Sequence, residues 1–134
     1  MGEFNSGVFL FFSLRVDVAE VKPLLEKFDF LNIDDQRRIS AVIEGILLEM
    51  ESKIGSLKKR KDVTKASIVK FQLIKNNLNH FKKEFEVRSS AGQKKALRTD
   101  KVAELKLELA GKYAALEQDF NLILDEIGAQ IILK

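Results

Sequence analysis

Cysteine and tryptophan are absent from this chain of 134 residues, and proline, histidine and tyrosine occur once each. Without cysteine there is no disulfide, no thiolate metal site and no cysteine nucleophile. A single histidine leaves no pair of imidazoles for a zinc site. With one proline and seven glycines, little of the chain is suited to tight turns. Long elements of secondary structure are therefore expected.

Sequence patterns typical of catalysis are also missing. The glycines are isolated rather than grouped into a phosphate-binding loop. Neighbouring carboxylates such as Asp125 and Glu126 do not face each other on a helix. Ser89 and Ser90 have no histidine close to them in sequence to activate a hydroxyl. We therefore expect a protein that is not an enzyme and that holds no metal and no cofactor.

Long apolar runs are missing too. The first apolar segment is too short to span a bilayer, and it lacks the basic start and cleavage site of a secretory signal. Residues 1–6 look like a leader, either native or left by cloning. Together with the absence of cysteine, this predicts a cytoplasmic protein with no membrane span.

Apolar residues make up 46% of the chain and charged residues 32%, which suits a packed core better than a disordered segment. Ten of the aromatic residues are Phe, whose side chain has no polar group and therefore indicates packing more than ligand contact. The length predicts a single domain over residues 1–134.

The N-terminal segment shows an alternation of period two. Its even positions are all apolar, namely Val8, Leu10, Phe12, Leu14, Val16 and Val18. This alternation, with β-branched and aromatic residues, predicts a β-strand over residues 8–18. The tail, residues 129–134, is also β-prone, and we expect that it could pair with this strand, within one chain or between two copies.

Helical spacing dominates the rest of the chain. We expect a short helix at residues 23–30, with Pro23 in its first turn, and three long helices near residues 35–54, 63–87 and 100–127. The first of these either ends at residues 55–56 or continues beyond them. Asn32 to Asp35 offers an N-cap, residues 88–95 an exposed connection, Asp100 a second N-cap, and Gly128 a C-cap. The sequence predicts a mainly α-helical protein, an elongated antiparallel bundle with coiled-coil-like packing.

Apolar residues define one stripe on each long helix. The first stripe includes Ile39, Ile43, Ile46, Met50, Ile54 and Leu57. The second consists of Ile68, Phe71, Ile74, Leu78, Phe81 and Phe85. The third includes Val102, Leu105, Leu109, Leu116, Phe120, Ile123 and Ile127. Further apolar residues widen the last helix's face, which predicts more than one packing neighbour and allows for a second subunit.

Charge is distributed unevenly along the chain. Residues 1–52 carry 5 basic and 10 acidic side chains, residues 53–101 carry 15 and 4, and residues 102–134 carry 3 and 6. One interpretation is that the three parts are packed neighbours whose charges neutralise each other. The other is that the basic segment forms a surface for an anionic partner.

The basic segment supplies the candidate binding residues. They are Lys58, Lys59, Arg60, Lys61, Lys65, Lys75, Lys82, Lys83, Lys94, Lys95, Arg98 and Lys101. In an antiparallel bundle the cluster that begins at Lys58 and the one that begins at Lys94 would lie toward opposite ends. Because lysine predominates over arginine, phosphate contacts there would be non-specific and salt-sensitive.

Two functions are consistent with these patterns. We expect a non-enzymatic helical interaction or assembly module that self-associates, as a homo-oligomer, or docks a partner helix through its apolar stripes. The alternative is a protein that uses residues 53–101 to bind nucleic acid non-specifically, or to bind an acidic protein. Salt dependence separates the two, because binding to phosphates weakens steeply with salt and apolar docking does not.

Overall fold

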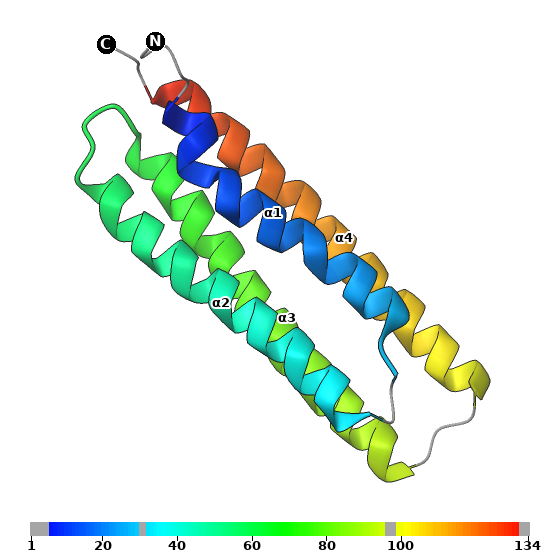
Figure 1. The fold of residues 1–134 in the computed structure, drawn as a ribbon. Coiled ribbons are helices and arrows are strands. Elements are labelled where there is room, and N and C mark those ends of the chain that lie inside the picture. Colours follow the sequence, from blue (N-terminus) through cyan, green and yellow to red (C-terminus); the bar gives the residue numbers. More distant parts are fainter. Residues whose placement is uncertain (1–5, 30–31, 96–98, 132–134) are drawn as a thin grey trace.

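The computed structural model describes residues 6–29, 32–95 and 99–131, with side chains at residues 11–29, 32–90 and 101–131. These residues form four helices: α1 (Ser6–Lys27), α2 (Ile33–Lys58), α3 (Lys65–Lys95) and α4 (Thr99–Gln130). Figure 1 shows them side by side, alternating in direction along an elongated bundle. The prediction of a mainly α-helical protein is confirmed, with four long helices in place of three.

Each helix packs against two neighbours. α1 and α3 both contact α2 and α4, and the described residues show no close backbone approach across either diagonal. Short connections produce this arrangement, because they fold each helix back along the one before it. The start of α1, the end of α4 and the α2–α3 connection therefore share one end of the bundle, here called the α2–α3 end (Figure 1). The α1–α2 and α3–α4 connections lie at the other end.

The predicted N-terminal strand is wrong, since these residues form α1 and the described residues contain no strand. The buried side chains of this helix are spaced by three and four residues, at Phe11, Leu14, Val18, Val21 and Leu25. Phe12 and Val16 belong to the alternating pattern but are 60% and 41% exposed. The alternation was therefore a coincidence within an apolar helix, and packing against α2 and α4 decided the conformation.

The short helix predicted for residues 23–30 is not a separate element: residues 23–27 are helical but form the end of α1, and residue 30 lies outside the described residues. Pro23 lies inside α1. Proline has no N–H to donate to the carbonyl of Ala19, one turn earlier. The neighbouring Val18 carbonyl accepts a hydrogen bond of 2.7 Å from the Tyr113 hydroxyl of α4. This buried bond fixes α1 to α4 close to the proline.

The start of α2 follows its prediction closely. Asn32 is the N-cap, and its side-chain oxygen accepts hydrogen bonds from the backbone N–H groups of Asp34 (2.9 Å) and Asp35 (3.4 Å). Of the two ends that the sequence left open, the later one is observed, because α2 continues through Gly55 to Lys58. Burial of the neighbouring residues Ile54 and Leu57 keeps this last part helical.

Both later helices are longer than predicted. α3 begins after Thr64, whose hydroxyl oxygen accepts a 3.2 Å hydrogen bond from the backbone N–H of Ser67. It continues to residue 95, so the expected connection at residues 88–95 is helical, and Ser89 is fully buried. In α4, Asp100 and Gly128 lie inside the helix rather than at caps. Of the tail predicted to be β-prone, residues 129–130 are helical and residues 132–134 lie outside the described residues.

A continuous core runs through the bundle and contains side chains from all four helices. Aromatic rings connect the helices within it. Phe71 of α3 contacts Phe11 of α1 and Phe120 of α4, both at 6.1 Å between ring centroids. Phe28 and Phe85 meet at 5.5 Å near the α1–α2 connection. The predicted use of Phe for packing is confirmed at these positions.

The wide apolar face of α4 is largely explained within the chain, because α4 packs on both α1 and α3. Among the residues that widen this face, Ala110 and Leu124 are buried and Ala114 is half-buried. Leu107 and Leu122 remain 76% and 61% exposed. A second subunit is therefore not needed to cover most of this face.

Within the described ranges, no helix has the length and apolar character that crossing a bilayer requires.

Candidate functional site

A basic cluster surrounds the α2–α3 connection. Its members are exposed and comprise Lys58, Lys59, Arg60, Lys61 and Lys65. Arg60 makes two hydrogen bonds to Asp62, of 2.9 and 2.8 Å. None of the four lysines forms an ion pair with another described residue, although the charge of Lys58 contributes to the lowered pKa of Glu51. Lys83, which is exposed on α3, also forms no ion pair with a described residue. Among the side chains that the structure describes, the predicted basic surface is therefore most concentrated at the α2–α3 end.

Two lysines in the middle of the segment are instead paired with acidic residues. Lys75 lies 2.8 Å from Glu51 of α2. Lys82 lies 3.0 Å from Glu86 and 3.6 Å from Glu44 of α2. A hydrogen bond to Glu86, with the charges of Glu86 and Glu44, raises the pKa of Lys82. At these two positions the structure favours neutralisation between packed helices over a surface for phosphates.

The second predicted cluster lies at the opposite end of the bundle. Lys94 and Lys95 are the last residues of α3, and their side chains, like all of Arg98, lie outside the described part of the chain. Lys101 of α4 is 3.5 Å from Glu104. Since α3 has 31 residues, the two clusters are about 45 Å apart along the bundle. They cannot act as one compact site.

A cluster of four charges that the sequence analysis did not single out connects α3 and α4. Arg88 donates two hydrogen bonds to Glu108, of 2.6 and 3.0 Å, and one of 3.1 Å to Glu84. Lys112 lies 2.6 Å from Glu84. Hydrogen bonding to Arg88 lowers the pKa of Glu108 to about 2. Both carboxylates are thus held ionised by cations, which suits helix pairing rather than acid–base catalysis.

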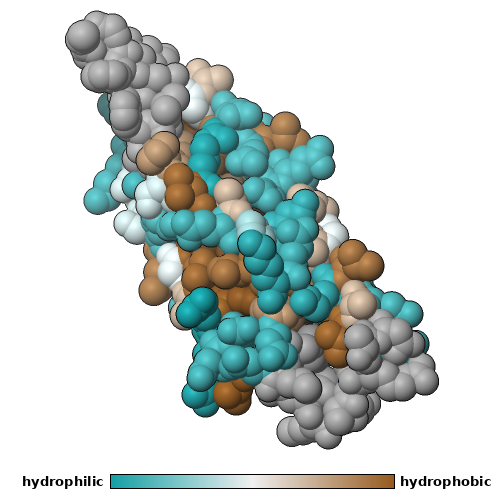
Figure 2. Space-filling model, turned by 45° about the vertical axis from the view of Figure 1, so that its right-hand side comes forward, coloured by the Kyte–Doolittle hydropathy of each residue, from teal (hydrophilic) through white to brown (hydrophobic). Residues whose placement is uncertain are grey.

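A groove of about 310 Å³ runs between α3 and α4 on the bundle surface. Four apolar side chains line it: Leu73, Ile74, Leu122 and Ile123. Leu73 is 57% exposed and Leu122 is 61% exposed, on opposite walls. Polar residues at its rim include Asp119 and the ion pair of Lys70 with Glu126, at 3.1 Å. On the face that Figure 2 displays, brown hydrophobic areas alternate with teal hydrophilic surface.

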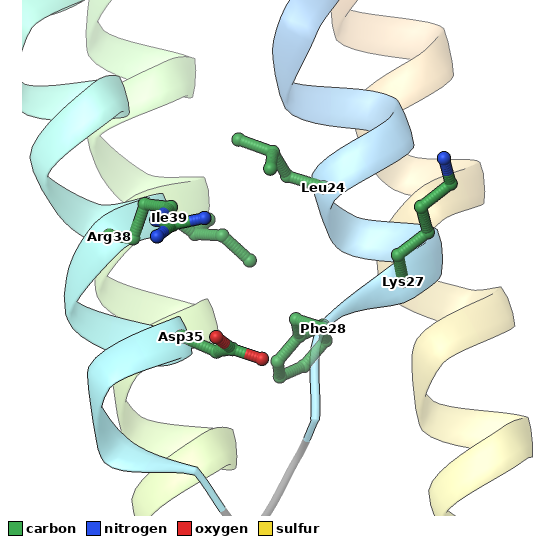
Figure 3. Close-up of a pocket in the computed structure, with 6 residues that line it drawn as sticks. All are labelled: Leu24, Lys27, Phe28, Asp35, Arg38 and Ile39. Atoms are coloured by element: carbon green, nitrogen blue, oxygen red, sulfur yellow. The ribbon is translucent and has the colours of Figure 1, made fainter.

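A smaller pocket of about 210 Å³ lies between α1 and α2, near the connection that joins them. Figure 3 shows Leu24 of α1 and Arg38 of α2 pointing toward each other across it, with Phe28 and Asp35 nearer the connection. The Asp35 carboxylate accepts a 2.8 Å hydrogen bond from the backbone N–H of Asp29. The pocket thus combines an apolar wall with an open guanidinium group.

Sequence spacing could have revealed part of what was missed. Glu84 and Arg88 are four residues apart on one helix, as are Glu108 and Lys112, and such pairs are recognisable from a helical pattern alone. Which helix each pair meets depends on the relative positions of α3 and α4, which no local pattern records. The single histidine, His80, is exposed, and the described residues contain no cluster of three side chains suited to a metal ion.

These features have to be interpreted from this chain alone. Comparison with protein-family models, with curated proteins and with solved structures finds no match to the chain.

Proposed function

We propose that this protein is a non-enzymatic interaction module whose α3–α4 groove receives an amphipathic helix, from a partner protein or from a second copy. The observation that carries the proposal is the pair Leu73 and Leu122, which stand largely exposed on opposite walls of a groove floored by Ile74 and Ile123. Apolar side chains in a groove between two helices are the usual receptor for the apolar face of a third helix.

The charged residues at the rim of the groove indicate which charges a docked helix should carry. Lys70 is already paired with Glu126, at 3.1 Å. Asp119 has no charged partner among the described residues. A docked helix with Leu or Ile at spacings of three and four, and a Lys or Arg beside that stripe, would fill the groove and pair with Asp119.

Solution mass over a range of concentrations tests self-association first. A dimer that becomes monomeric in the Leu73→Asp/Leu122→Asp variant, and stays dimeric in Leu107→Asp, would place the interface in the groove. Leu107 is a suitable control because it is also exposed on α4 but does not line the groove. A dimer that Leu107→Asp disrupts equally would show that the groove is not the interface.

If the chain is a monomer, a library of 20-residue amphipathic helices provides the second test. Selected binders should shift the backbone amide NMR signals of residues 70–77 and 119–126, and Leu73→Asp/Leu122→Asp should abolish those shifts. Binders that map only to other helices, or a library that yields none at millimolar concentration, would refute the proposal.

The second candidate is binding of nucleic acid or of an acidic protein, supported by the unpaired lysines at the α2–α3 end. With about four phosphates contacted on a duplex, the logarithm of the binding constant should fall against that of salt with a slope of about −3.6. The triple variant Lys58→Gln/Lys59→Gln/Lys61→Gln should weaken binding to a duplex. A matched control, Lys22→Gln/Lys27→Gln/Arg37→Gln, removes the same charge outside residues 53–101 and should bind almost normally. Equal loss in both variants would show that only net charge matters.

A further inference from the structure

We propose that the pocket between α1 and α2 binds a small amphipathic carboxylate, a molecule with one acid group on a compact apolar ring or short chain. The pocket is separate from the α3–α4 groove and shares no residue with it. Its apolar wall limits the size of the ligand, and its charged residues limit the charge of the ligand.

The apolar wall fits a body the size of one ring. Leu24 and Phe28 of α1 and Ile39 of α2 line the pocket, whose volume is about 210 Å³. Phe28 and Ile39 are almost fully buried, so they form a fixed floor, and Leu24 is only partly covered. An apolar cavity of about 150 Å³ is sufficient to bind benzene. The volume between α1 and α2 therefore accommodates a six-membered ring with a few additional atoms.

The guanidinium group of Arg38 provides the recognition of the acid. It is exposed, has no ion pair with any described residue, and lies on the α2 side of the gap, opposite Leu24 (Figure 3). Its planar arrangement of donors matches the two oxygens of a carboxylate. Lys27 also belongs to the lining but extends along α1 away from Arg38 in Figure 3, so it contributes charge rather than a direct contact.

Asp35 limits the ligand to a single negative charge. Its carboxylate lines the same pocket and is held there by the 2.8 Å hydrogen bond from the backbone N–H of Asp29. Two cations against this one carboxylate leave the lining with a single net positive charge. A monoanion matches that balance, whereas a phosphate with two charges would be repelled by Asp35.

Amide NMR shifts on titration of the full chain with three probes of similar shape test this directly. The probes are phenylacetate, phenylacetamide and phenethylamine. Phenylacetate should shift the signals of residues 24–28 and 35–39 and saturate. Phenylacetamide, which lacks the charge, should bind about tenfold more weakly, because a charge-assisted hydrogen bond is lost. Phenethylamine should bind more weakly still.

Two neighbouring arginines make a matched pair of variants. Arg38→Gln should weaken phenylacetate binding about tenfold, to the level of phenylacetamide, and leave phenylacetamide binding unchanged. Arg37→Gln removes the same charge from an exposed residue outside the pocket, so it should bind phenylacetate almost normally. Both arginines are exposed, so both variants should retain the helical circular dichroism of the wild type.

Three results would overturn the proposal. The first is equal binding of phenylacetate and phenylacetamide, which would mean that the acid is not recognised. The second is equal weakening by Arg37→Gln and Arg38→Gln, which would reduce the effect to net charge. The third is the absence of shifts at residues 24–28 and 35–39 at 20 mM phenylacetate. None of these results bears on the α3–α4 groove, so the two proposals can fail independently.

Discussion

Between α3 and α4, charged and polar side chains meet along the helices, whereas the contact between α1 and α2 is mainly apolar. At the α2–α3 end, Ser67 donates a 2.5 Å hydrogen bond to Glu126 and accepts one of 2.7 Å from Gln130. Toward the other end, Arg88 holds Glu108 with two hydrogen bonds. A hydrogen bond that crosses from α1 to α2, from Ser13 to Glu49, is exposed and 3.4 Å long.

One bundle thus combines a fixed helix register, between α3 and α4, with an open pocket between α1 and α2. Directional contacts near both ends of the α3–α4 seam allow only one relative position of these helices. Apolar contact is less directional, so it constrains the relative position of α1 and α2 less than the polar contacts constrain α3 and α4. The proposed carboxylate pocket lies between α1 and α2, beside Leu24 and Arg38.

The largest expected loss of stability comes from a cavity in the core, to which all four helices contribute. Phe71 is fully buried and contacts rings of both α1 and α4. We expect Phe71→Ala to lower the free energy of unfolding by about 3–5 kcal/mol, because it removes buried apolar surface and leaves a cavity. Urea unfolding followed by circular dichroism measures this. The control Leu73→Ala, at an exposed position of the same helix, should cost less than about 1 kcal/mol. Similar losses in both variants would contradict the burial shown here.

Two serines compare the contacts directly, Ser67 between α3 and α4 and Ser13 between α1 and α2. Ser67 is fully buried, and its hydroxyl donates to Glu126 and accepts from Gln130 and from Thr64. We expect Ser67→Ala to lower the free energy of unfolding by about 1 kcal/mol, because the hydrogen bonds of its buried hydroxyl group are lost.

Ser13→Ala provides the other half of this comparison. Ser13 is exposed within α1, where alanine is favoured over serine by about 0.5 kcal/mol or less. The free energy of unfolding should therefore stay constant or rise slightly. If both serine variants lose the same stability, the α3–α4 seam does not depend on its polar contacts as we infer.

How much of this fold was predictable differs between α1 and the other three helices. The stripes of α2, α3 and α4 and the Asn32 cap follow from residue spacing, because they depend on the local sequence. The helix α1 does not, since its apolar residues fit both a strand and a helix. Its conformation is decided by burial of Phe11 and Val18 against distant helices.

The candidate sites also differ in how far the sequence predicts them. The dense basic cluster around Lys59 is visible in the sequence, and it remains exposed in the fold. The pairing of Lys75 with Glu51 depends on the alignment of α2 with α3, which no periodicity specifies. The α1–α2 pocket is harder still to foresee, because its walls come from two helices. Leu24 and Phe28 were expected on a separate short helix, and nothing in the local pattern places that helix beside Arg38.

A similar effect is expected at the buried link between α1 and α4. The Tyr113 hydroxyl is almost fully buried and donates to the Val18 carbonyl. Tyr113→Phe keeps the ring and removes this bond, so we expect a loss of about 1 kcal/mol in the free energy of unfolding, measured with urea. An unchanged stability would mean that the carbonyl of Val18 is satisfied equally well without the hydroxyl.

The smallest effect is expected from acid titration of the α3–α4 seam. Hydrogen bonding to Arg88 lowers the pKa of Glu108 from 4.5 to about 2. A carboxylate with a lowered pKa in the folded state stabilises the fold above its unfolded pKa, and this contribution is lost as the pH falls through the folded value. The midpoint of urea unfolding should therefore decrease between about pH 4.5 and about pH 2. The decrease should be smaller in Glu108→Gln, which has no carboxyl group to titrate.

Two further measurements distinguish this seam from the rest of the surface. Glu20 is exposed on α1, away from the α3–α4 seam, so Glu20→Gln should keep the wild-type acid dependence. High salt should reduce the difference between wild type and Glu108→Gln, because Glu108 is partly exposed and its ion pairs are screened. Glu20→Gln could instead reduce the pH dependence of the unfolding midpoint as much as Glu108→Gln does. The effect would then come from overall charge. The ion pairs between α3 and α4 would not be what distinguishes this contact from the one between α1 and α2.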